Sequence, residues 1–448
     1  MLSPQQAQDR AQDLVERARR AGADAADAIY AANASEGIQI RLGKLEDVER
    51  SESEHIALRV FSGKRSASIG SSDLSPAALD ELAERAISMA RLAPEDAYAG
   101  LAPEELLTQG PWPELDMIDT AELSPQALRT MAEEGEDAAR AVAGVTNSDG
   151  ASAHSGSGVF ALATSHGFAG GYASTTHSLS VSVVAGEGSA KQRDNAWRQA
   201  HHQVDLPSAA EIGDLAGTRA VGRLNPGRVK SGPMPVVFDP RVAGSLIGHL
   251  LGAMSGSAIA RRSSFLLDRL DAQIFPAGTL IAEDPHRPRG LRSRPFDGEG
   301  LATRAGHLVE DGRVTGWLLD TASARQLGLT PTGHAARSGG GSPSVSVGNV
   351  HLAAGALSPR ELMADIKDGI YVTELIGQGV NGVTGDYSRG ASGVRIVNGE
   401  LAGPVAELTV AGNLLSMFAK LTPASDLEWH RAINVPTIRI DGMTVAGE

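Results

Sequence analysis

The sequence contains no cysteine among its 448 residues. This absence excludes disulfide bonds, thiolate zinc sites, iron–sulfur clusters and a cysteine nucleophile. A metal bound by this chain would therefore depend on its 12 histidines and its carboxylates. The histidines form no recognisable ligand motif, because H-E-x-x-H is absent and no histidine is followed directly by glutamate.

Positive charge and long apolar runs are also scarce. The chain has 40 Lys and Arg against 54 Asp and Glu, a formal net charge of −14, and its basic clusters are short and interrupted. We therefore expect no direct contact with nucleic acid, which needs an extended basic surface. Residues 1–20 lack the apolar centre of a signal peptide, and the charge-free span 242–260 is too polar to cross a membrane. These features predict a cytoplasmic protein without a membrane contact.

Glycine is abundant: it makes up 52 of the 448 residues, about 12 %, whereas its usual share is about 7 %. Ser-Pro pairs, which place serine at the N-cap and proline in the first turn, predict helices after Ser3, Ser75, Ser124 and Ser358. Polar and apolar residues alternate between the first two of these helices, which predicts half-buried antiparallel strands there. In the second half, short apolar runs between glycines predict many strands, including one at Gly316–Leu319.

These patterns predict an α+β fold with two domains. The first, residues 1–225, combines helices with an antiparallel sheet, and a second boundary within it falls near 95–120, where prolines predict a connecting arm. The second, residues 226–448, is glycine-rich and mainly antiparallel β, either a barrel or a sandwich. At about 150 residues per domain, the length agrees with two or three domains.

Two glycine-rich motifs resemble nucleotide sites without meeting their requirements. Gly377–Gly382 matches G-x-G-x-x-G, but the glycines that follow it exclude the helix on which a pyrophosphate would sit. We expect these glycines to serve turns and bulges. Ser338–Ser342 has no lysine where a phosphate-binding loop requires one, and it is interpreted as a loop.

Two groups of polar residues remain as candidates. His249 lies in line with Val242 and Leu246 on an expected helix, a spacing typical of a core or interface histidine. Asp386, Tyr387, Ser388 and Arg389 form a dense polar group in what is expected to be a glycine loop. Both a functional loop and an ordinary surface turn fit this group.

Several longer blocks of sequence resemble the TldD/PmbA family. They cover the chain from about residue 35 to its C-terminus and include Gly244–His249, Phe296–Gly300 and Thr384–Gly393. In this family the TldD-type subunit carries H-E-x-x-x-H on a helix and a C-terminal cysteine that complete a zinc site. At the matching positions this sequence has Gly244, Ser245 and His249, and it has no cysteine. Because zinc hydrolysis needs about three protein ligands and a general base, the resemblance implies a TldE/PmbA-type subunit without its own metal site.

The resemblance further implies a partner and a substrate. A TldD-like subunit would carry the zinc and form a heterodimer with this chain, and the complex would degrade or process unfolded peptides. His249 and Asp386–Arg389 are the residues that would face the substrate or the partner. The sequence does not decide whether the isolated chain forms a homodimer.

Two other functions stay open at this point. The chain could be a metallopeptidase by itself, with an unorthodox site built from His249 and His201, His202 or acidic residues. Alternatively, it could be a binding or regulatory protein of the kind that the family's older name, modulator of DNA gyrase, suggests.

Overall fold

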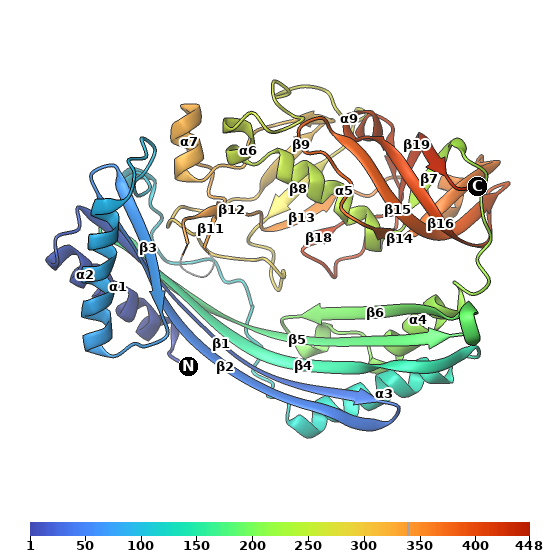
Figure 1. Ribbon diagram of the computed structural model, residues 1–448, viewed down its shortest axis with the longest axis horizontal. Coiled ribbons are helices and arrows are strands. Elements are labelled where there is room, and N and C mark those ends of the chain that lie inside the picture. Colours follow the sequence, from blue (N-terminus) through green and yellow to red (C-terminus); the bar gives the residue numbers. More distant parts are fainter. Residues whose placement is uncertain (338–340) are drawn as a thin grey trace.

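The computed structural model describes residues 1–337 and 341–448, so most of the expected loop at 338–342 lies outside the described residues. Its first half is built on one antiparallel six-stranded sheet with the order β3-β2-β1-β4-β5-β6. The strands are β1 (Ala25–Arg41), β2 (Lys44–Ser62), β3 (Arg65–Ser71), β4 (Val145–Thr164), β5 (Ala169–Ala185) and β6 (Gln192–Ala200). Figure 1 shows the sheet curving beneath the second half of the molecule, with β6 at the edge that faces it.

Helices cover the other face of this sheet. They are α1 (Pro4–Arg20), α2 (Pro76–Leu92), α3 (Pro125–Ala141) and α4 (Ala209–Val221). As predicted, Ser3, Ser75 and Ser124 are N-caps followed by proline, and each side chain accepts a backbone N–H three residues on. Alanine and aliphatic side chains of the helices pack against every second residue of the strands.

The start of β1 is buried on both faces, whereas the alternation predicted half-buried strands. Ala26 and Ala28 face the helices, while Asp27 and Ile29 face the second half of the chain. Ile29 packs there with Phe168 and Phe296. The second half thus covers a sheet face that an isolated antiparallel sheet would expose to water.

The second half contains a closed barrel. Its strands are β7 (Gly232–Phe238), β14 (Asp368–Ile376), β15 (Asp386–Val397), β16 (Glu400–Asn413) and β19 (Ile438–Ala446). Each strand pairs with the next in the order β16-β15-β14-β7-β19, and pairing of β16 with β19 closes the ring. β17 (Leu421–Pro423) extends the sheet at β19. The fold is therefore α+β, with the barrel alternative realised in the second half.

Smaller elements surround the barrel. A second sheet has the order β10-β9-β8-β13-β18, and β11 pairs with β12. The strands are β8 (Ile281–Asp284), β9 (Gly306–Glu310), β10 (Arg313–Val314), β11 (Ala335–Ala336), β12 (Ser344–Val345), β13 (Asn349–Leu352) and β18 (Ile433–Asn434). The helices are α5 (Pro240–Ala253), α6 (Gly256–Ala260), α7 (Thr321–Leu327), α8 (Pro359–Met363) and α9 (Leu414–Phe418). The 3-10 turns are η1 (Glu104–Leu106), η2 (Gly188–Ala190) and η3 (Gln203–Asp205).

One predicted strand is wrong. Gly316–Leu319 contributes only an isolated bridge between Leu318 and Ser255, because this segment turns into the N-cap of α7 instead of extending a sheet. Ser358 caps α8 as predicted.

The segment 93–119 lies between α2 and α3, is mostly irregular and forms backbone hydrogen bonds with the second half. Thr108 N–H donates to the carbonyl of Gly300, and Arg289 N–H donates to that of Leu115. The sheet itself continues across this segment, because β1 pairs with β4. The division into residues 1–225 and 226–448 stays a prediction, as does the boundary near 95–120.

Within residues 1–337 and 341–448, no helix is long and apolar enough to cross a membrane.

Candidate functional site

Helix α5 carries Gly244, Ser245 and His249, the three positions at which the sequence was expected to match a zinc motif. Asp239 caps it by accepting the N–H of Arg241 at 2.8 Å, and Pro240 occupies its first turn. Leu246, Ile247 and Leu250 are buried in the barrel core.

The opposite side of α5 is formed by glycines at a four-residue spacing. A Cβ built at Gly248 or Gly252 would meet no atom within 4 Å, and one at Gly244 would meet only the carbonyl oxygen of Ile433 at 3.6 Å. These glycines leave one face of α5 open to the surrounding hollows.

The three motif positions do not share a cavity. Gly244 and Ser245 line a hollow of about 410 Å³ that faces β6. His249 lines a different hollow, of about 290 Å³, together with Gly248 and Gln378. The Ser245 hydroxyl donates to the carbonyl of Val242 at 2.7 Å. The side chains of Ser245 and His249 therefore lie in different surroundings.

The structure brings three of the predicted residues together: His249, Tyr387 and Arg389. The rings of His249 and Tyr387 meet edge to face with centroids 6.2 Å apart. Burial raises the pKa of Tyr387 to about 12 against the opposing effect of Arg389. Burial and the positive charge of Arg389 lower the pKa of His249. His249 Nε2 and the Tyr387 hydroxyl are buried, and neither makes a hydrogen bond with the described residues.

The expectation that Asp386–Arg389 forms a loop is wrong, because these residues begin strand β15. Side chains alternate along a strand, so Tyr387 and Arg389 point inward while Asp386 and Ser388 are exposed. The Asp386 carboxylate accepts hydrogen bonds from Thr384 Oγ1 at 2.7 Å and Asn413 Nδ2 at 3.2 Å. These bonds lower its pKa. The four residues are thus two pairs on opposite faces, and only the inward pair reaches His249.

Gly377 and Gly382 of the G-x-G-x-x-G segment lie in a bend and a turn, as the prediction of turns required, and Gly379 makes a close backbone contact that was not predicted. A Cβ at Gly379 would lie 1.9 Å from the carbonyl oxygen of Ser388, and Gly377 has a φ of +82°. Strand β15 follows this segment, so it offers no helix N-terminus for a phosphate.

His201 and His202 lie in other surroundings than His249. The His201 ring nitrogens lie 2.6 Å from the carbonyl oxygen of Thr175 and 3.1 Å from that of Gly290. His202 Nε2 lies 2.9 Å from the carbonyl of Asp116. Nowhere in the described part of the chain do three His, Asp or Glu side chains meet in a way that could hold a metal ion.

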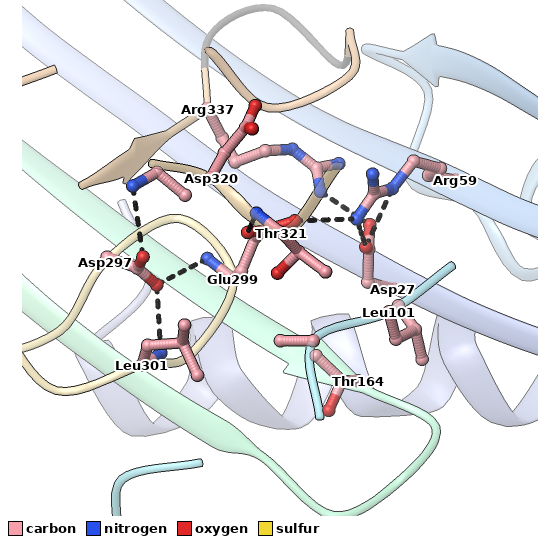
Figure 2. Close-up of polar contacts among 12 residues, drawn as sticks. Asp27, Arg59, Leu101, Thr164, Asp297, Glu299, Leu301, Asp320, Thr321 and Arg337 are labelled. Carbon is pink, nitrogen blue, oxygen red and sulfur yellow. Dashed lines mark hydrogen bonds and ion pairs between the residues drawn. The ribbon is translucent and has the colours of Figure 1, made fainter. Parts of the chain in front are cut away.

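A buried ionic network lies between the two halves, and the sequence did not predict it. Figure 2 shows Asp27 of β1 between the guanidinium groups of Arg59 and Arg337. Arg59 Nε donates to Asp27 Oδ2 at 2.9 Å, and Arg337 Nη1 donates to Oδ1 at 2.7 Å. The Arg337 side chain is fully buried, and Asp27 is 1 % exposed. The pair of Asp27 with Arg337 joins strand β1 of the first half to the second half.

Two further carboxyl groups lie beside this network. Glu299 Oε1 is 4.0 Å from Arg59 Nη2, and its Oε2 accepts the N–H of Thr321 at 2.8 Å (Figure 2). Burial raises the pKa of Glu299 to about 7. Asp297 accepts backbone N–H groups, and burial raises its pKa as well. In sequence, Asp297 and Glu299 belong to Phe296–Gly300, one of the blocks that carried the family resemblance.

Models of the PmbA/TldD family match most of this chain. Domain 1 of the PmbA/TldA metallopeptidases matches residues 26–90, their central domain residues 118–224, and their C-terminal domain residues 231–447. The chain belongs to the PmbA/TldD family of metallopeptidases.

Full-length relatives agree with this assignment. The protein named Metalloprotease PmbA from Escherichia coli O157:H7 is 38 % identical over 95 % of this chain and 93 % of its own length. The Metalloprotease PmbA homolog from Haemophilus influenzae is 36 % identical over 97 % of this chain and 94 % of its own.

Solved structures share the whole fold. A Bacteroides thetaiotaomicron protein described as a modulator of DNA gyrase superposes with a TM-score of 0.92 at 26 % identity, covering 100 % of both chains. TldE from Thermococcus kodakarensis superposes with a TM-score of 0.85 at 20 % identity, covering 98 % of this chain and 100 % of that one. At 20 % identity, the similarity to TldE shows a shared fold and nothing more.

Proposed function

We propose that this chain is the TldE/PmbA-type subunit of a heteromeric metallopeptidase and binds no zinc of its own. A TldD-like partner would carry the zinc, and the complex would degrade or process unfolded peptides. The observation that carries the proposal is the donor set on α5: Gly244 has no side chain, and the Ser245 hydroxyl bonds to the helix backbone.

The surroundings of His249 also argue against a zinc ion. The family implies such an ion, and zinc sites in proteins have three or four ligands. His249 supplies one imidazole, and no other residue around its hollow is a histidine or a carboxylate. The nearby cation Arg389 would repel a metal ion and already lowers the pKa of the ring. The residues present therefore do not fit a zinc site on α5.

In this proposal the chain contributes peptide binding. Its long antiparallel sheet ends in the edge strand β6, which pairs with β5 over His177–Ala185. An edge strand can accept an extended peptide as a further strand, which suits an unfolded substrate. The cytoplasm is the compartment in which we place the complex, since a cysteine-free chain needs no oxidising environment.

The test is co-expression with a protein that contains H-E-x-x-x-H, followed by co-purification, zinc analysis and a peptide-cleavage assay. We expect zinc and cleavage in the pair and neither in this chain alone. Stoichiometric zinc in the isolated chain, with chelator-sensitive cleavage that His249→Ala abolishes, would instead establish an independent metallopeptidase. A stable complex with gyrase and no stimulation of a TldD-like subunit would establish a regulatory protein.

A further inference from the structure

A cleft rich in arginine lies between the edge strand β6 and the second half of the chain. It consists of the hollow of about 410 Å³ beside Gly244 and a neighbouring hollow of about 390 Å³. Gln199, Leu291 and Arg431 line both, so the two hollows adjoin. We call them together the cationic cleft.

The charge of this cleft is opposite to that of the whole chain, which is −14. Its arginines come from distant parts of the sequence: Arg198, Arg241, Arg287, Arg289, Arg292 and Arg431. The lining has one carboxylate among its described residues, Asp205, and this group is paired with Arg289 at 3.2 Å. Arg241 pairs with Asp194, outside the lining, at 2.9 Å.

The remaining arginines lack a neutralising partner. Within the described ranges, no carboxylate lies within 4.0 Å of the guanidinium nitrogens of Arg198, Arg287, Arg292 or Arg431. Arg431 Nε is buried and has no hydrogen-bond acceptor in that part of the chain. Burying part of a cation without a partner costs free energy, so Arg431 is the arginine of the cleft that an anionic ligand would stabilise most.

The neighbouring titratable groups respond to this excess of positive charge. Burial, followed by Arg198 and Arg241, lowers the pKa of Arg431. Burial, Arg198, Arg431 and Arg219 lower the pKa of His430 to about 4, so it stays neutral at physiological pH.

The shape of the cleft favours an extended peptide over a compact anion. One wall is the edge strand β6, of which Trp197, Arg198, Gln199 and Ala200 line the cleft. The Trp197 carbonyl there accepts a hydrogen bond from Arg198 Nη1 at 2.9 Å, which a bound peptide would replace. Four residues of strand span about 13 Å. On the opposite wall Gly244 leaves space beside the helix, and the Arg287 guanidinium stacks on Trp429 at 3.7 Å. A peptide strand paired with β6 would thus have its side chains near arginines.

We propose that the cationic cleft binds an extended peptide segment through carboxylate groups, with β6 supplying backbone hydrogen bonds. This inference deepens the peptide-binding role proposed above by assigning its place and its charge preference. Arg431 and Arg198 bind the carboxylates, and Gly244 leaves room for the peptide.

The experiment measures binding to the full chain alone by fluorescence anisotropy. The probe is a fluorescein-labelled peptide of alternating Glu and Thr, with an amidated C-terminus, compared with a Lys and Thr peptide of the same length. We expect the acidic peptide to bind and the basic one to fail.

Variants locate the binding. Arg431→Gln should raise the Kd of the acidic peptide at least 10-fold, since a hydrogen bond to a charged group contributes about 1.5–3 kcal/mol. Arg198→Gln, at a half-exposed position, should weaken binding as well, and it protects the test against a folding defect in Arg431→Gln. The control Arg360→Gln removes an exposed arginine paired with Glu400 and should leave the Kd unchanged.

Three results would overturn the proposal: equal binding of acidic and basic peptides, no effect of either cleft variant, or equal affinity of an acidic peptide with N-methylated backbone amides. The measurement needs neither zinc nor a partner subunit. If the chain binds the peptide but forms no complex with a TldD-like subunit, only the proposed function is contradicted. A working complex whose isolated chain does not bind the acidic peptide would contradict only the cleft.

Discussion

The buried ionic network between the two halves makes a quantitative prediction. In Asp27→Asn the side chain keeps its shape but loses the charge that neutralises Arg59 and Arg337. The Arg59 side chain is 8 % exposed and that of Arg337 is fully buried, so water cannot replace the lost carboxylate. Arg59 retains Glu299 at 4.0 Å, whereas Arg337 already has Nε and Nη2 without hydrogen-bond partners among the described residues.

Removing one partner of a buried ion pair costs about 3–5 kcal/mol. We therefore expect the free energy of unfolding of Asp27→Asn to fall by that amount in urea titrations followed by circular dichroism. The matched control is Asp368→Asn, which breaks the exposed pair with Arg395 at 2.9 Å. There we expect a loss below about 1 kcal/mol, because exposed pairs contribute little. Equal, small losses in both variants would refute the account of Asp27 as the neutralising group of the network.

Three further predictions concern Glu299, the α5 glycines and Tyr387. Burial raises the pKa of Glu299 from an ordinary value of 4.5 to about 7, so the folded protein holds this proton more tightly than the unfolded chain. The free energy of unfolding should therefore fall as the pH rises from 4.5 through 7, and Glu299→Gln should flatten this fall in urea titrations from pH 4.5 to 8. An unchanged pH profile in the variant would contradict this prediction. Gly248→Ala should stabilise the protein by about 0.5–1 kcal/mol, because the new Cβ would meet open space. Gly213→Ala should destabilise it, because that Cβ would lie 2.1 Å from the carbonyl oxygen of Gly135. Thermal unfolding should show the two opposite shifts, and a destabilised Gly248→Ala would show that the face of α5 is filled. Tyr387→Phe removes a buried hydroxyl that has no hydrogen bond among the described residues. The free energy of unfolding should therefore stay unchanged or rise, and a loss above about 1 kcal/mol would show that the hydroxyl has a partner.

Local sequence signals predicted the helices of the first half well. Ser-Pro pairs act within one turn of the chain, and Ser3, Ser75 and Ser124 all cap helices in the structure. Glycine-rich segments likewise indicated turns, as at Gly377 with its φ of +82°. These features depend on neighbouring residues and need no tertiary context.

Tertiary context decided what the sequence could not predict. Asp386–Arg389 looked like a loop because glycines flank it, but pairing with residues 410–413 of β16 makes it a strand. The pairing of Asp27 with Arg337 joins residues 310 positions apart, and no local pattern signals it. Of the predicted site, His249 was placed correctly on its helix, but the arginines of the cationic cleft are spread from residue 198 to residue 431 and meet only in the folded chain.

The order of pairing in the large sheet has a consequence for the synthesis of this protein. Strand β1 is complete at residue 41, yet its second neighbour β4 begins at residue 145, and Arg337 is added to the chain almost 300 residues after β1. During translation Asp27, Ile29 and Arg59 therefore lie on an uncovered sheet face until the second half has been made. Asp27 can pair with Arg337 only after the ribosome has completed about three quarters of the chain, and Ile29 can pack against Phe296 only after about two thirds. The buried network thus joins the earliest strands to one of the later segments, and the two halves acquire their common core as a late step of folding.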